Sequence, residues 1–64
     1  MKIKKGDIIQ APEDVIDYHG IKEVEVVLVD RKEKVVTWKF ETEIDGIETH
    51  VLDKMPFSEI IKLD

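Results

Sequence analysis

The sequence predicts an all-β fold, a single small five-stranded barrel with one 3₁₀ turn before the last strand. Hydrophobic residues alternate with period two along residues 23–30, 34–44 and 47–53, which is the pattern of successive strands in a β-meander. Only short polar turns separate these stretches, Arg31-Lys32-Glu33 and Asp45-Gly46. The chain has 64 residues, so we expect one domain over residues 1–64, in which closure of the sheet would help to bury a small core.

Residues 2–10 are expected to form the first strand, with Ile3, Ile8 and Ile9 as its buried contacts. Gly6 interrupts this pattern, as glycine does at a bulge or at a close approach of another backbone. Residues 11–22 are then expected to form a long loop, because Pro12 cannot donate to a ladder, the acidic residues tolerate turns and a glycine permits positive φ.

The two central strands carry most of the expected core. Residues 23–30 begin with clean alternation and become apolar on both faces, which predicts a bent strand shared by two packed sheets. Along residues 34–44, Val36, Trp38, Phe40 and Ile44 fall on one side and polar or charged residues on the other. Trp38 and Phe40 are therefore expected to lie in the core.

Asp45-Gly46 predicts a tight hairpin, because a type I′ turn needs positive φ at both central residues. The fourth strand follows, and residues 53–56 are expected to end its ladder. The last segment fits two patterns, one helical turn beginning at Phe57 and a period of two at Ile61 and Leu63. A single 3₁₀ turn followed by a short closing strand satisfies both.

This order of elements resembles an SH3-like barrel over essentially the whole chain. Within that superfamily, Lys5-Gly6-Asp7-Ile8-Ile9, followed by a glycine and the apolar run 26–30, looks like the opening of KOW-type modules, which often bind RNA or the transcription and translation machinery. Phe40 with residues 57–61 resembles the closing half of the small barrel proteins found at the periphery of photosystem I, which are protein-docking modules. These two resemblances imply different partners.

The charge and composition of the chain disfavour several kinds of partner and chemistry. The net charge of −5 sets a repulsive mean field against nucleic acid and anionic membranes. The absence of cysteine excludes disulfides and thiolate chemistry, and a cytoplasmic location is expected. No stretch approaches the roughly 18 apolar residues of a membrane span, so we expect no membrane partner.

The candidate binding surface is acidic and aromatic. It combines residues of the predicted loop with the adjacent turn: Glu13, Asp14, Asp17, Tyr18, His19, Pro56 and Phe57. Acid, aromatic ring and imidazole in one loop favour recognition of another protein with a basic or polar surface. The alternative is a solvated loop with Tyr18 folded over the mouth of the barrel. A small regulatory module of this kind would also suit a phage or mobile-element accessory protein.

The second candidate surface is basic. Lys5, Arg31, Lys32 and Lys34, with two further lysines near the start, could grip a phosphate backbone if the fold brought the two clusters together. This alternative is a KOW-like nucleic-acid or ribosome-associated module. Because the sheet has exposed edges that could pair, the protein is expected to be either a monomer or an edge-paired homodimer.

Catalytic and metal-binding residues are sparse. One serine, Ser58, two histidines and no cysteine give little material for a nucleophile with its base, so no enzyme activity is expected. His19 and His50 have acidic neighbours in the sequence but no recurring ligand spacing, so neither metal nor cofactor is expected.

Overall fold

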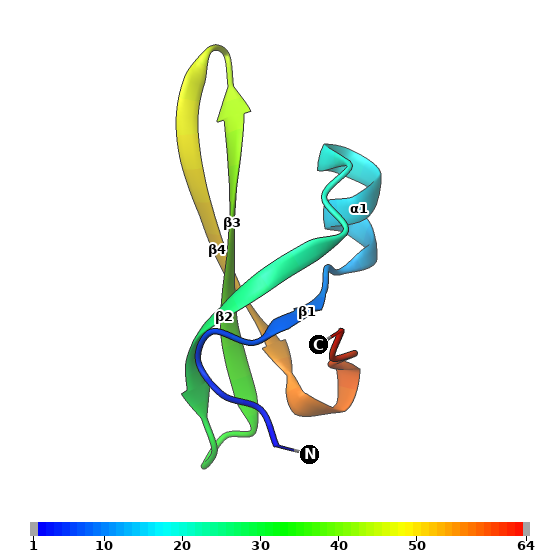
Figure 1. The fold of residues 1–64 in the computed structure, drawn as a ribbon, viewed down its shortest axis with the longest axis vertical. Helices are drawn as coiled ribbons and strands as arrows, with labels where there is room; N and C mark the ends of the chain where they lie inside the picture. Colours follow the sequence, from blue (N-terminus) through cyan, green and yellow to red (C-terminus); the bar gives the residue numbers. More distant parts are fainter. Residues whose placement is uncertain (1, 64) are drawn as a thin grey trace.

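The computed structural model describes residues 2–63, and within that range it contains four strands, one α-helix and one 3₁₀ turn (Figure 1). Their order along the chain is β1 (Ile8–Gln10), α1 (Glu13–His19), β2 (Glu23–Asp30), β3 (Val35–Ile44), β4 (Ile47–Pro56) and η1 (Phe57–Glu59). The strands form one antiparallel sheet in the order β1-β2-β3-β4. The sequence predicts an all-β fold with a single 3₁₀ turn, and both are confirmed apart from the short helix α1.

The predicted five-stranded closed barrel is wrong, because the sheet of the described residues has four strands and does not close. The segment after η1 reaches β1 but forms only an isolated bridge between Ile9 and Lys62, with the Gln10 N–H donating to the Ile61 carbonyl at 2.8 Å. The first strand is three residues long instead of the nine expected, so it offers little edge for a fifth strand. β4 runs on to Pro56, past the expected end of its ladder.

The bend expected in β2 takes the form of a bulge. Val26 lies opposite Trp38 and Leu28 opposite Thr37, so Val27 is an extra residue on the β2 side of the ladder. On its other side, the Val26 N–H donates to the Asp7 carbonyl and the Gly6 N–H donates to the Val26 carbonyl, at 2.9 and 2.8 Å. A side chain at Gly6 would meet no neighbouring atom, so the close approach expected at this glycine does not explain it, and its φ of 95° does. The strand bends within one sheet and does not join two.

The core lies on the inner face of the sheet, between the strands, α1 and the C-terminal segment. Alternate residues of β3 point into it, and Trp38 and Phe40 are 2% and 6% exposed, as the alternation predicted. Its largest fully buried side chains are Ile3, Ile9, Val26 and Val36. Ile44 also has the predicted parity, yet it is 45% exposed because it lies beyond the packed body.

The hairpin of β3 and β4 projects from this body and accounts for the 37 Å length of the molecule (Figure 1). Asp45 and Gly46 have φ of 53° and 79°, so the predicted hairpin turn with two positive φ angles is confirmed. Ile44 and Ile47 flank this turn opposite each other. We call residues 41–50 the distal arm. Most of its side chains are exposed, and it carries the acidic residues Glu41, Glu43, Asp45 and Glu48.

Candidate functional site

The segment expected to be a long loop contains α1, so that prediction is wrong. The proline and the glycine that suggested a loop lie at the two ends of this helix. Pro12 has φ of −58° before the first turn, and Gly20 has φ of 69° after the last turn. The Gly20 N–H closes the end by donating to the Ile16 carbonyl at 2.9 Å. Glu13 and Asp14 in the first turn complement the positive end of the helix dipole. Packing of Val15 against the core holds this short helix in place.

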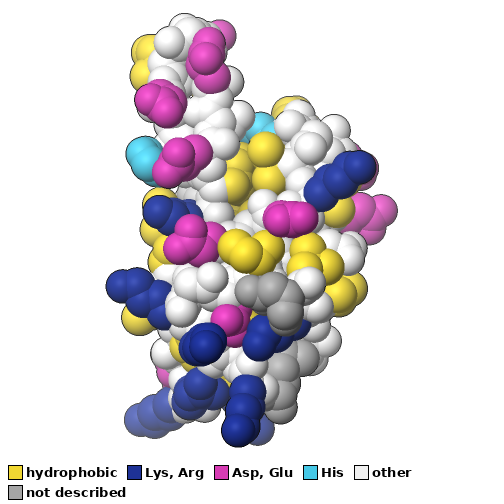
Figure 2. Space-filling view, viewed as in Figure 1, with side chains coloured by type: hydrophobic (Ala, Val, Ile, Leu, Met, Phe, Trp, Pro, Cys, Tyr) yellow, Lys and Arg dark blue, Asp and Glu magenta, His cyan; other side chains and the backbone are white. Residues whose placement is uncertain are grey.

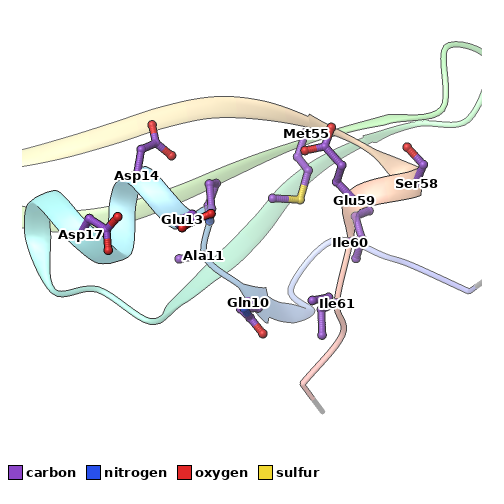
Figure 3. A pocket seen from close by; sticks show the side chains of 11 residues that line it. Gln10, Ala11, Glu13, Asp14, Asp17, Met55, Ser58, Glu59, Ile60 and Ile61 are labelled. Atoms are coloured by element: carbon purple, nitrogen blue, oxygen red, sulfur yellow. The ribbon is translucent and has the colours of Figure 1, made fainter.

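A groove of about 830 Å³ lies between α1 and η1 (Figure 3). Carboxylates from both elements border it, three from α1 and Glu59 from η1. Ala11, Met55 and Ile60 supply apolar surface beneath them and belong to the core. Its lining residues are Gln10, Ala11, Pro12, Glu13, Asp14, Asp17, Met55, Ser58, Glu59, Ile60 and Ile61.

The carboxylates that border the groove have no positively charged partner among the described residues. Within residues 2–63 only two acid–base side-chain pairs are close, Lys62 with Asp7 at 3.4 Å and the imidazole of His50 with Glu41 at 3.6 Å. None of the carboxylates that border the groove takes part in either pair. A groove with an apolar base and unpaired acids along its border favours a ligand that is both cationic and partly apolar.

Two smaller hollows lie beside this groove, between α1 and β4, and Trp38 lines both. Asp14 and Asp53 line both hollows together with Trp38. The indole ring stacks on Phe40 with ring centres 6.0 Å apart, and Phe40 in turn contacts the His19 ring at 5.1 Å. The buried Trp38 Nε1–H has no acceptor among the described residues. The acidic surface therefore continues from the groove past an aromatic stack.

The structure divides the predicted protein-binding residues among these three hollows. Glu13, Asp14 and Asp17 share the main groove. Tyr18 and His19 line the hollow beside Phe40, and Pro56 lines the other one beside Trp38. Phe57 packs against the core and lines none of these three hollows. Tyr18 is 88% exposed and does not fold over the sheet.

Sequence reasoning missed Glu59, Met55 and Asp53 as parts of this surface. η1 places Glu59 across the groove from α1, and β4 supplies Met55 and Asp53, two residues apart on the same side of the strand. No local pattern in the sequence connects any of the three with α1. The parity of Met55 would have been the useful signal, since it lies on the same side of β4 as the half-buried Thr49 and Val51.

The structure also joins the two predicted basic clusters at the opposite end from the distal arm. The Arg31 Nη2 donates to the Ile3 carbonyl at 2.6 Å, which fixes the β2–β3 turn against the N-terminal segment. A hollow of about 540 Å³ is lined there by Lys2, Ile3, Lys4, Arg31 and Lys62. Lys5, Lys32 and Lys34 are exposed but do not line it. Figure 2 shows basic side chains gathered at this lower end and acidic ones on the projecting arm.

Asp7 is the one buried charged residue of the described chain, and it lies at the basic end. Its Oδ2 accepts from the Lys4 N–H at 3.0 Å and lies 3.4 Å from the Lys62 Nζ. Burial raises the pKa of this carboxyl, but the hydrogen bonds from Lys4 and Lys62 and the charge of Lys62 outweigh it, so the pKa lies below its ordinary value. Asp7 is thus an ionised anchor for the C-terminal segment.

A metal site does not form from the side chains that the structure describes. In residues 2–63, no three His, Asp or Glu side chains gather closely enough to hold an ion. His50 pairs with Glu41 on the outer face of the arm, whereas His19 lies against Phe40. No helix of the described chain is long and apolar enough to cross a membrane.

Comparisons with family models, with curated proteins and with solved structures gave no match for this chain. The family resemblances of the sequence therefore stay predictions, although the closed barrel that the SH3-like resemblance implied does not form in the described residues.

Proposed function

We propose that this protein is a small non-enzymatic binding module that holds a basic segment of another protein in the groove between α1 and η1. The main support for this proposal is that unpaired carboxylates and apolar surface occur together in one groove of about 830 Å³. Lysine or arginine side chains of the partner would pair with Asp14, Asp17 and Glu59. Their aliphatic stems and neighbouring apolar residues would cover Met55 and Ile60.

Charge reversal in the groove is expected to weaken binding of this partner by at least about tenfold, because attraction to two carboxylates becomes repulsion. The variant carries Asp14→Lys and Asp17→Lys, both on the exposed side of α1. Its matched control carries Glu23→Lys and Glu33→Lys, two exposed positions outside the groove that change the net charge equally. The immobilised proteins are compared for capture from cell extract with and without nuclease treatment.

The proposal requires a protein that the wild type and the control retain and the groove variant loses. Equal capture by all three proteins would exclude the groove as the binding surface. Capture that disappears from the wild type after nuclease treatment would show that nucleic acid, and not the protein, carries the interaction. Circular dichroism of each variant checks that α1 is retained.

A second candidate function is favoured by the Arg31 contact with Ile3, which brings the two basic clusters to one end of the molecule. We propose single-stranded nucleic acid as the ligand of that end, held through its phosphates. The hollow lined by Lys2, Lys4, Arg31 and Lys62 would receive the backbone, with Lys5, Lys32 and Lys34 beside it. This surface is independent of the groove.

Nucleic-acid binding would show a strong dependence on salt. Neutralising about three phosphates gives a slope of roughly −2 in a plot of log affinity against log salt concentration. Fluorescence anisotropy with a labelled single-stranded oligonucleotide measures it. Lys4→Glu with Lys32→Glu should abolish the binding, whereas Lys22→Glu, at the opposite end of β2 from Lys32, should preserve most of it. A slope near zero would contradict this second candidate.

A further inference from the structure

The outer edge of β4 is unpaired. β4 is the last strand of the sheet, and no part of residues 2–63 forms a ladder along its free side. It is ten residues long and extends from the body into the projecting arm (Figure 1). A long, exposed edge presents a row of free N–H and carbonyl groups to which another strand can add.

The register shows which backbone groups face outward. The Phe57 N–H donates to the Lys34 carbonyl at 2.8 Å, so this pair is a hydrogen-bonded one of the β3–β4 ladder. Hydrogen-bonded pairs alternate along an antiparallel ladder, so the odd residues of β4 bond β3 and the even ones face outward. The Lys54 N–H is consistent with this assignment, because it donates to the Asp53 Oδ1 at 2.8 Å and not to a carbonyl of β3. Pro56, at the next even position, ends the row of donors.

The apolar side chains of the hairpin are also uncovered. Ile47 and Leu52 of β4 are 67% and 58% exposed, and Ile44, opposite Ile47, is 45% exposed. Ile47 lies near the turn, and Leu52 lies on the opposite face of the strand. In so short a chain this is a large share of the apolar surface to leave in water.

We propose that the β4 edge is the interface of a homodimer, in which β4 pairs antiparallel with β4 of a second copy and Val51 lies opposite Val51. This register places Glu48 opposite Lys54 of the second copy, and the two-fold axis repeats that pair. It also places Ile47 beside Met55 of the second copy. The two sheets then form one continuous sheet of eight strands, twice the four that each copy contributes.

Charge within the hairpin supports this register. Glu43 and Glu48 lie directly opposite each other on β3 and β4, where two like charges are unfavourable. Lys54 of the second copy would come next to Glu48 and offset that repulsion. The neighbouring register, with His50 opposite His50, places Glu48 opposite Leu52 and gives no such pair.

Charge reversal followed by charge exchange tests the proposal. Sedimentation equilibrium of the whole chain over a range of concentrations should show a dimer. Glu48→Lys and Lys54→Glu should each raise the dimer dissociation constant by roughly tenfold or more, because each turns two attractive pairs into two repulsive ones. The double variant carrying both changes restores the opposite charges and should restore the dimer. Glu23→Lys, an exposed change on β2, is the control and should dimerise as the wild type does.

Amide hydrogen exchange gives a second readout that does not depend on these variants. The N–H groups of His50 and Leu52 face outward, so they should exchange slowly at high protein concentration and quickly at low concentration. The N–H groups of Val51 and Asp53 bond β3 and should be protected at both. A chain that is monomeric at all concentrations would overturn the proposal. The proposal would also be overturned if the single charge reversals left the dimer dissociation constant unchanged, or if the double variant failed to restore the dimer.

Discussion

Replacing Ile9 with alanine is expected to remove most of the protein's stability against unfolding at room temperature. Ile9 is fully buried in β1, opposite Val24, and it also bridges to Lys62 in the C-terminal segment. Truncating such an isoleucine costs about 2–5 kcal/mol through lost burial and a residual cavity. A single core of this size rarely supplies more than about 3–5 kcal/mol, so little stability would remain.

Urea unfolding followed by the fluorescence of Trp38, the single tryptophan, measures this effect. Ile9→Val removes one methyl group and should cost about 0.5–1.5 kcal/mol. Leu28→Ala is the control, because Leu28 is 61% exposed and its loss should change stability by less than about 0.5 kcal/mol. Equal midpoints for Ile9→Ala and Leu28→Ala would contradict the described core.

Loss of the Asp7 carboxylate is expected to cause the other large effect, and to remove part of the acid sensitivity of the fold. The folded pKa of Asp7 lies below the unfolded value of about 3.9. Its ionised form therefore stabilises the protein above that value, and this contribution disappears as the pH falls through the folded pKa. Asp7→Asn loses the pair with Lys62, so the C-terminal segment should detach from β1 more readily.

Thermal unfolding of the wild type and of Asp7→Asn over a range of pH tests this expectation. The difference in midpoint should be constant above about pH 5 and should shrink below about pH 4. Asp17→Asn is the control, because that carboxylate is exposed on α1 and has no ion-pair partner among the described residues. A midpoint difference for Asp7→Asn that stays unchanged to pH 2 would show that Asp7 is not the ionised anchor.

Features encoded by adjacent residues were predictable from the sequence. The Asp45-Gly46 turn depends only on the φ angles that the two residues adopt, and both are positive. The burial of Trp38 and Phe40 follows from the alternation of one strand. In each case the information lies within a few residues of the chain.

Features that depend on distant contacts were not predictable in the same way. α1 is only seven residues long, so packing of Val15, more than helix propensity, decides that it forms. Its flanking Pro12 and Gly20 fit a loop equally well. Closure of the sheet depends on whether the last segment forms a full strand beside β1, and it makes only the bridge at Lys62.

The α1 side of the candidate groove was predictable from the sequence, and the η1 side was not, because it depends on distant contacts. Glu13, Asp14 and Asp17 stand out together in the sequence, and the helix keeps them on one surface. Glu59 reaches that surface only because β4 and η1 return the chain to α1. The basic end likewise needed the contact of Arg31 with Ile3, 28 residues apart.

Binding of a cationic, partly apolar segment in the α1–η1 groove is the central claim, and a titration followed by amide NMR tests it most directly. The probe is a short peptide of alternating lysine and leucine, compared with one in which glutamate replaces lysine. The account predicts that only the lysine peptide shifts amide signals, and that those of Asp14, Asp17, Glu59 and Ile60 move most. Shifts confined to the distal arm or the basic end, or equal shifts with both peptides, would contradict it.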